Sequence, residues 1–367
     1  MTTLRLIADD LTGALDAAAE FVGLTGPVHA FWQDARPDPL PANAALDLGT
    51  REAGPVTARN ATIAALPALA RADIAFKKID SLMRGQTLLE LAACFTAGSW
   101  DRAVLAPAFP FQGRVTRHGQ QFAQFENRWT PVGPDLVEAL RALGVPAQPA
   151  TPGAALPRGI TVFNADTDAE LDEAVARAGG AGAPVLWCGT GGLARALAGD
   201  GAPAAVPALP GPILGLFGSD QAATAAQLAA CDPHWIALLD GDAGSAARLV
   251  SGLDRHGIAL ATHDLPAGVS RAEAAERIDL VFRALVHRQP PPGTLVVAGG
   301  ETLRGLCLAL RATSLEVRGR ALPGVPVSIL RGGAWDGVTV FSKSGAFGHP
   351  TLLRDLLRIP EFERTAR

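Results

Sequence analysis

The sequence predicts an α/β protein with two domains, each containing a mostly parallel sheet flanked by helices, and with an active-site cleft between the domains. Its 367 residues exceed what one ordinary core holds and suit two domains of about 150 to 200 residues. Short apolar runs alternate with stretches of helical apolar spacing, as in parallel sheets covered by helices. A segment with four prolines, residues 200–212, interrupts this alternation. We therefore expect domains at residues 1–206 and 207–367, joined by this linker.

In the first domain, the expected strands are short apolar runs that end in polar or glycine residues. They cover residues 4–8, 44–50, 74–80, 103–109, 160–166 and 184–190. Two helices are indicated between them by apolar residues at helical spacing. These residues are Leu11, Leu15, Ala18, Ala19 and Val22, and then Leu88, Leu91, Ala92 and Phe95.

The second domain repeats this pattern after the linker. The expected strands cover residues 213–219, 235–242, 258–264 and 294–300. The expected helices cover residues 221–230 and 270–288, and a third begins near Glu301.

Composition and charge exclude several classes of partner. A net charge of -4 provides no basic face for nucleic acid or anionic lipid. No apolar run reaches the roughly 18 residues of a membrane span, and the acidic start lacks a secretory signal, so we expect a cytoplasmic protein. The four scattered cysteines have no metal-ligand spacing and are expected to be buried free thiols.

Candidate functional residues lie at the carboxyl ends of the expected strands, where open α/β sheets bind ligands. In the first domain these ends carry cations and carboxylates together, at Asp9-Asp10, residues 49–51, 77–81 with Arg84, and 107–114. In the second domain they carry mainly glycines and hydroxyl groups, at residues 218–219, 240–242, 299–302 and 343–345.

The two sets of residues suit two kinds of ligand. Arg51, Lys78 and Arg84 are fitted to hold a small carboxylate or phosphate. Glycine turns before helices expose backbone N–H groups that favour the phosphates of a nucleotide. Simpler interpretations stay open: Asp10 as a helix N-cap, Lys77 and Lys78 as a solvated strand end, and the glycine pair as a tight turn.

Familiar nucleotide and hydrolase motifs are missing. The segment GTGGLARALA, residues 189–198, fits neither the Walker nor the Rossmann pattern, and no GxSxG or HExxH occurs. This counts against an NAD-dependent oxidoreductase, which stays an alternative because of its similar topology. A non-catalytic two-domain protein that binds a sugar acid is the other alternative.

Several blocks of sequence, in order, resemble the four-carbon acid sugar kinase family. The blocks are IADDLTGALDAAAEF, KKIDSLMRG, APAFPFQGRVTRHGQQF, FNADTDAELDEAV, GGETL and SKSGAFG, and they span nearly the whole chain. Three positions depart from the pattern usual in the family: Leu82 replaces a hydroxyl residue, Leu303 a serine and Ala346 an asparagine.

The resemblance implies an ATP-dependent kinase that phosphorylates the terminal hydroxyl of threonate, erythronate or 3-oxo-tetronate. By matching position, the sugar acid would be held by Asp10, Arg51, Lys78, Ile79, Asp80 and Ser81. ATP would be contacted by Ser219, Gly299, Gly300, Glu301, Thr302 and Gly345, with Mg²⁺ on the triphosphate. The catalytic aspartate would be Asp9, Asp10 or Asp80. The metal ligands are left open, and a homodimer is an open expectation.

Overall fold

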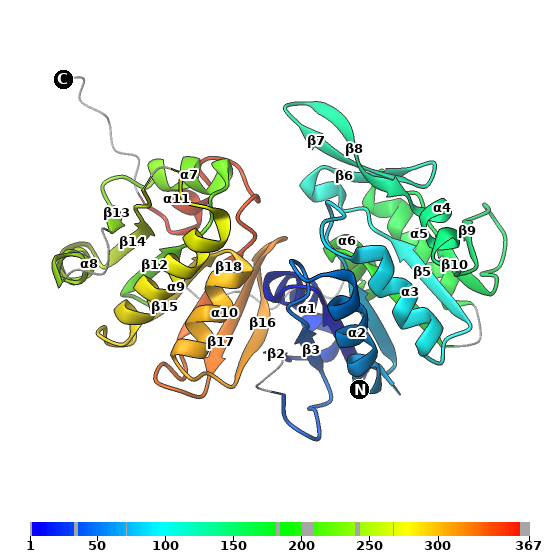
Figure 1. Ribbon diagram of the computed structural model, residues 1–367, viewed down its shortest axis with the longest axis horizontal. Helices are drawn as coiled ribbons and strands as arrows, with labels where there is room; N and C mark the ends of the chain where they lie inside the picture. The colour runs from blue at the N-terminus through cyan, green and yellow to red at the C-terminus, as the bar shows by residue number, and fades with distance from the viewer. Residues whose placement is uncertain are drawn as a thin grey trace. The chain divides into compact units, whose positions relative to one another are not determined.

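The computed structural model of the chain (Figure 1) describes residues 2–32, 36–70, 72–180, 184–199, 209–238, 243–266 and 268–359. It divides into two compact units: Met1–Ala204 with Val317–Pro323, and Ala205–Glu316 with Gly324–Arg367. Most of the expected linker, residues 200–208, lies outside the described residues, as does the expected strand end at 239–242.

The first unit is built on a parallel sheet. Its strands follow the order β2 (Val28–Trp32), β3 (Ala44–Asp47), β1 (Leu4–Ala8), β4 (Ile74–Lys78), β11 (Val185–Gly189), β5 (Arg102–Ala106), β10 (Gly159–Val162) and β9 (Ala147–Pro149). All of these neighbours pair in parallel. The expected strands are thus present, with ends that differ by a few residues.

The register of this sheet brings the polar strand ends together. Ala8, the last residue of β1, lies opposite Asp47 of β3 and Lys78 of β4. Lys78 in turn lies opposite Gly189 of β11. The residues that follow these strands therefore share one edge of the sheet.

Helices cover both faces of this sheet (Figure 1). One face is covered by α1 (Leu11–Thr25), α5 (Asp168–Gly179) and α6 (Gly191–Ala198), which pack on one another. The other is covered by α2 (Pro55–Leu69), α3 (Thr87–Ala97) and α4 (Leu136–Ala142). Leu69, Leu91 and Leu140 of these last helices pack with Ile7 and Leu105 of the sheet in one apolar cluster, so burial of apolar surface holds the second face in place.

A small antiparallel sheet also belongs to the first unit. It consists of β6 (Arg114–Arg117), β7 (Gln120–Phe125) and β8 (Arg128–Asp135), and β7 and β8 form a long hairpin (Figure 1). The sequence did not predict these strands, because polar residues dominate them and much of β8 is exposed.

The second unit contains another mostly parallel sheet. Its strands follow the order β13 (Trp235–Leu238), β14 (Ile258–His263), β12 (Ile213–Phe217), β15 (Thr294–Ala298), β18 (Thr339–Lys343), β17 (Val325–Arg331) and β16 (Ser314–Leu322), of which only the first three residues belong to this unit. The pairs from β13 to β18 are parallel, whereas β17 runs antiparallel to β18. Phe217, Ala298 and Lys343 lie side by side at the carboxyl ends of their strands.

The helices of the second unit follow its strands. They are α7 (Ala222–Ala229), α8 (Ala243–His256), α9 (Arg271–Val286), α10 (Gly300–Ala309) and α11 (Leu352–Leu356). α9 packs on α10, and α7 packs on α11. The helices expected over residues 221–230 and 270–288 and near Glu301 are therefore present.

Residues 317–323 belong to the first unit although they follow most of the second in sequence. There Arg320 Nη1 donates a 2.7 Å hydrogen bond to Glu20 Oε1 of α1. The four cysteines are free and buried, as the sequence predicts. Within the described ranges, no helix combines the length and apolar character needed to cross a membrane.

Candidate functional site

The acidic pair after β1 begins the site of the first unit. Asp10 is the N-cap of α1: its Oδ1 accepts a 3.0 Å hydrogen bond from the Gly13 backbone N, and its Oδ2 accepts one of 2.8 Å from Thr12 Oγ1. A Cβ atom at Gly13 would lie 2.5 Å from Asp10 Oδ1 and 3.1 Å from Lys78 Nζ. Only a residue without a side chain lets this carboxylate and this ammonium group approach the start of the helix.

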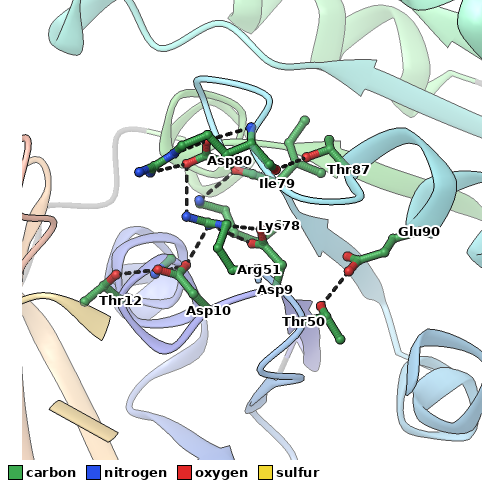
Figure 2. A network of polar contacts seen from close by, with 12 residues as sticks. Asp9, Asp10, Thr12, Thr50, Arg51, Lys78, Ile79, Asp80, Thr87 and Glu90 are labelled. Atoms are coloured by element: carbon green, nitrogen blue, oxygen red, sulfur yellow. Dashed lines mark hydrogen bonds and ion pairs between the residues drawn. The ribbon is translucent and has the colours of Figure 1, made fainter. Parts of the chain in front are cut away.

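Arg51 joins the carboxylates of this site (Figure 2). Its Nε donates to Asp9 Oδ2, and its Nη2 lies 2.9 Å from Asp9 Oδ1 and 3.0 Å from Asp10 Oδ1. Its Nη1 lies 3.3 Å from Asp80 Oδ1. One guanidinium group therefore fixes three aspartates that come from the ends of two different strands.

Asp80 has a second cationic partner. Arg84 Nε and Nη2 each donate a 2.8 Å hydrogen bond to its carboxylate, and the Arg84 backbone N donates a third of 3.0 Å. Burial alone would raise the pKa of Asp80, but the hydrogen bonds and charge of Arg84, with the charge of Arg51, hold it well below its usual range. Burial is likewise outweighed at Asp9, whose pKa is lowered chiefly by Arg51. Both carboxylates thus stay ionised and remain paired with arginines.

Two adjacent lysines at the end of β4 have different partners. Lys77 is fully buried, and its Nζ lies 2.6 Å from Glu90 Oε2 of α3. Burial lowers the pKa of Lys77, but Glu90 more than compensates and raises it above its usual value. Lys78 is 6% exposed, donates a 2.8 Å hydrogen bond to the Ile79 carbonyl, and has no ion pair within the described part of the chain. Both lysines are buried, so the interpretation as a solvated strand end is wrong.

One supporting residue, Glu90, was missed from the sequence. Glu90 Oε1 accepts a 2.5 Å hydrogen bond from Thr50 Oγ1, next to Arg51 (Figure 2). The buried Lys77–Glu90 pair thereby supports the loop that carries Arg51. No sequence signal singles out Glu90 except its place on the buried side of a helix.

Gln121 of β7 is a second such residue. Its Nε2 donates to the Ser81 carbonyl at 3.2 Å and to the Pro107 carbonyl at 3.1 Å. It links the loop after β4 to the loop after β5. The block RHGQQF contains it, but no rule of spacing identified its role.

In the second unit, the expected nucleotide residues cluster at the ends of β12, β15 and β18. A Cβ atom at Gly345 would lie 1.9 Å from Ser219 Oγ, and one at Gly218 would lie 2.2 Å from Thr302 Oγ1. The Gly299 backbone N donates a 3.1 Å hydrogen bond to the Lys343 carbonyl. These glycines form a cradle of backbone and hydroxyl groups that side chains would fill, which fits a polyphosphate.

The rest of the GGET block begins α10. Gly299 has φ 108°, a conformation that favours glycine, and is followed by Gly300 and the exposed Glu301 in the first helical turn. Leu303, one of the departures from the family pattern, is fully buried. It contributes to packing, and its backbone N donates a 3.1 Å hydrogen bond to the Gly299 carbonyl.

A cavity of about 310 Å³ adjoins this turn, between α9 and α10. Its apolar lining comes from Ile278, Phe282 and Leu306, and Gly218 and Thr302 lie on its border with the turn. The lining also includes the charged residues Asp279, Arg283, Glu301 and Arg304. A cavity with apolar and polar walls beside a glycine cradle suits a nucleoside with attached phosphates. Across the described ranges, no cluster of three or more His, Cys, Asp or Glu side chains is arranged to hold a metal ion. Mg²⁺ commonly uses one or two carboxylates together with substrate phosphates.

Two family models match the chain. Residues 4–197 match a sugar-binding N-terminal domain, and residues 214–353 match a nucleotide-binding C-terminal domain. Each match covers most of one unit.

Similar proteins span the chain almost completely. A D-threonate kinase of Cupriavidus necator is 32% identical, and one of Bordetella bronchiseptica is 28% identical; each alignment covers 95% of both chains. The crystal structure of a DUF1537 protein of Haemophilus influenzae has a TM-score of 0.69 at 20% identity, over 97% of this chain and 100% of that one. This last likeness concerns the fold.

Proposed function

The chain belongs to the four-carbon acid sugar kinase family, and we propose that it transfers the γ-phosphoryl group of ATP to the terminal hydroxyl of a four-carbon sugar acid. Threonate, erythronate and 3-oxo-tetronate are the candidate acceptors. The observation that carries the proposal is the buried ammonium group of Lys78, which has no ion pair among the described residues and lies near Gly13, as the Asp10 carboxylate does.

Lys78 is proposed to bind the carboxylate of the sugar acid. A buried ammonium group is stable only with a compensating anion or hydrogen bonds, and within the described residues Lys78 has one carbonyl partner. Arg51, whose donors are occupied by aspartates, holds the site rigid instead. The proposed substrate residues also include Ile79, Asp80, Ser81 and Arg84 on the loop after β4.

Asp10 is proposed to orient the attacking hydroxyl and accept its proton. Asp9 and Asp80 are poor bases, because their cationic partners lower their pKa. The Asp10 side chain is 22% exposed, more than that of Asp9 or Asp80. Its two hydrogen bonds from α1 fix the direction in which it meets a ligand.

The second unit is proposed to hold ATP through Ser219, Gly299, Gly300, Glu301, Thr302 and Gly345. The cradle would receive the phosphates and the cavity between α9 and α10 the nucleoside. Mg²⁺ would enter with the nucleotide and neutralise charge on the transferring phosphoryl group. Glu301 is the acidic residue of the GGET block that could contribute a carboxylate to it.

The chemistry needs alignment more than bond activation. The hydroxyl oxygen forms a bond to the γ-phosphorus while the bond from that phosphorus to the ADP oxygen breaks, and the hydroxyl proton passes to Asp10. Such a transfer has a loose transition state, so rate enhancement comes from holding donor and acceptor in line. Closure of the two domains over both substrates, which would exclude water, is part of the proposal.

Coupled measurement of ADP release tests the function. Purified protein with Mg-ATP is given each stereoisomer of threonate and erythronate, and 3-oxo-tetronate. We expect turnover with at least one acid and no ADP release with the corresponding sugar alcohols, which lack the carboxylate for Lys78. Absence of turnover with every acid would overturn the kinase proposal.

Two binding measurements separate the alternatives. Tetronate binding without nucleotide binding would favour a sugar-acid-binding protein, and binding of NAD in preference to ATP would favour an oxidoreductase. A cytoplasmic location and a homodimer stay predictions, which fractionation and light scattering address.

A further inference from the structure

Lys343, the last residue of β18, is a buried cation that the assignments above leave without a role. It is 2% exposed, and its Nζ has two long polar contacts, 3.3 Å to Thr224 Oγ1 and 3.5 Å to the Gly345 carbonyl. It forms no ion pair with any residue that the structure describes. Burial lowers the pKa of Lys343 to about 8.

The surroundings of Lys343 are the glycine cradle. Its Cα lies opposite Ala298, which lies opposite Phe217, so the turns after all three strands meet around it. Its own carbonyl accepts the Gly299 N–H, and Thr224 Oγ1 donates a 2.7 Å hydrogen bond to the Gly345 carbonyl. The ammonium group of Lys343 therefore lies against the residues that form the cradle, Thr224 and Gly345 among them.

Lys77 shows what a structural buried lysine looks like in the same chain. It is also inaccessible, but it has Glu90 at 2.6 Å. An isolated ammonium group in such a position is strongly unfavourable, because neither water nor a counter-ion stabilises it. An anion that arrives with a ligand would remove this penalty, and the cradle is shaped for one.

We propose that Lys343 binds the polyphosphate of the nucleotide and neutralises part of its charge. The inference rests on the proposed nucleotide site and adds to it the cation that the glycine turns lack. A point charge on a flexible chain is the usual complement to backbone N–H groups in phosphate sites. Selectivity for ATP over the uncharged nucleoside would therefore depend on this residue.

The test compares K343Q with wild type by calorimetry, using ATP, ADP and adenosine. Glutamine keeps a donor for Thr224 Oγ1 and the Gly345 carbonyl but lacks the charge. We expect ATP and ADP to bind about 10- to 100-fold more weakly, the loss typical for a charged hydrogen bond, with adenosine changed by less than about threefold. K343R, which keeps the charge, should retain more of the ATP affinity than K343Q.

R288M is the matched control for general loss of positive charge. Arg288 is exposed and lies between α9 and β15, near the amino end of a strand that runs parallel to β18. R288M should leave the affinities for ATP and adenosine unchanged. Unfolding temperatures without ligand show whether each variant is folded; if K343Q is not, K343M provides the same comparison, and K343R supplies the charged reference.

The outcomes separate two failures. If wild type binds neither ATP nor ADP, the proposed nucleotide site is wrong. If wild type binds ATP but K343Q binds it equally well, or loses ATP and adenosine to the same degree, the phosphate role of Lys343 is wrong and the lysine is structural.

Discussion

The strand ends of the two units use charge in opposite ways. In the first unit, Asp9, Asp10, Arg51, Asp80 and Arg84 form ion pairs with one another, whereas the neighbouring Lys78 has no ion pair among the described residues. In the second unit, glycines and hydroxyl groups lie around Lys343, a buried cation without an ion pair among the described residues.

The difference matches the two proposed ligands. A short hydroxylated acid offers few contacts, so a rigid network of fixed charges is needed to select it and to direct one hydroxyl. A polyphosphate carries its own charge and many acceptor atoms, so backbone donors and one cation are sufficient. The first unit is therefore expected to be sensitive to geometry and the second to net charge.

R51M should have the largest effect, because it breaks the network at its centre. It leaves Asp9, Asp10 and Asp80 close together without their shared cation. We expect the free energy of unfolding to fall by about 3–5 kcal/mol, as for other broken buried ion pairs. We expect kcat/KM to fall by at least about 10³-fold, because alignment of the acceptor is lost as well. Urea unfolding and ADP release measure the two effects.

R158M provides the comparison for R51M. Arg158 pairs with Asp101 at 3.3 Å, but both side chains are largely exposed. Such pairs add little to stability, so unfolding and turnover should match wild type. An R51M protein as stable as R158M would show that the network is not the organising feature of the first unit.

D10N should affect catalysis and leave folding intact. Asparagine caps helices as well as aspartate does, so α1 keeps its start, but the amide cannot accept the hydroxyl proton. We expect kcat to fall by about 10²- to 10⁴-fold, the range for loss of a general base. The unfolding midpoint in urea should fall only slightly, because Arg51 keeps Asp9 and Asp80 as partners.

D135N is the matched variant for this prediction. Asp135 also caps a helix, accepting a 2.8 Å hydrogen bond from the Glu138 backbone N at the start of α4. It should keep full activity. Equal turnover in D10N and D135N would mean that Asp10 is only a cap.

E90Q leaves Lys77, like Lys78 and Lys343, buried without an ion pair, and so tests the comparison between the units directly. We expect the free energy of unfolding to fall by about 3 kcal/mol or more, because an uncompensated charge is left in the core. Replacing both partners, as in K77M with E90L, should recover much of this loss, since apolar pairs of similar volume pack well. Urea unfolding of wild type, E90Q and the double variant measures these free energies of unfolding.

Glu273 supplies the exposed counterpart. It pairs with Arg277 at 2.8 Å on the surface of α9. E273Q should change the free energy of unfolding by no more than about 0.5 kcal/mol. If E90Q has as small an effect, burial does not make the Lys77 pair important.

Local sequence patterns predicted most of the fold and the positions of several candidate site residues. The apolar runs located the parallel strands, and because such strands share a carboxyl edge, Asp10, Lys78 and Gly299 were predicted at ligand-facing positions. The antiparallel strands β6 to β8 were not predicted, since their residues are polar and their pairing is set by contacts across the hairpin.

The partners within the site depend on contacts distant in sequence. Arg51 reaches Asp9 across 42 positions, and Glu90 reaches Thr50 across 40. Side chains of Lys77 and Lys78 point to opposite faces of the sheet, as alternation along a strand requires, but only the packed helix α3 shows which one meets an acid. Nothing local distinguishes Lys343, with no acid, from Lys77.

The pH dependence of ATP binding is the smallest effect and the finest test of the second unit. The pKa of Lys343 without ligand is lowered to about 8 by burial, and ATP is proposed to bind the charged form. As the pH rises through this value, more of the protein must take up a proton for ATP to bind, so the affinity falls, by at most about tenfold per pH unit.

K343Q carries every other ionisable group of this edge, including Glu301, Arg304 and Asp279, so its profile isolates the lysine. Calorimetry between about pH 7.5 and 9.5 should show a decline in wild type and a flat profile in K343Q, because burial brings the pKa of Lys343 into this window and glutamine does not titrate. Parallel profiles would place the titrating group elsewhere and leave the cradle to bind phosphate by its backbone alone.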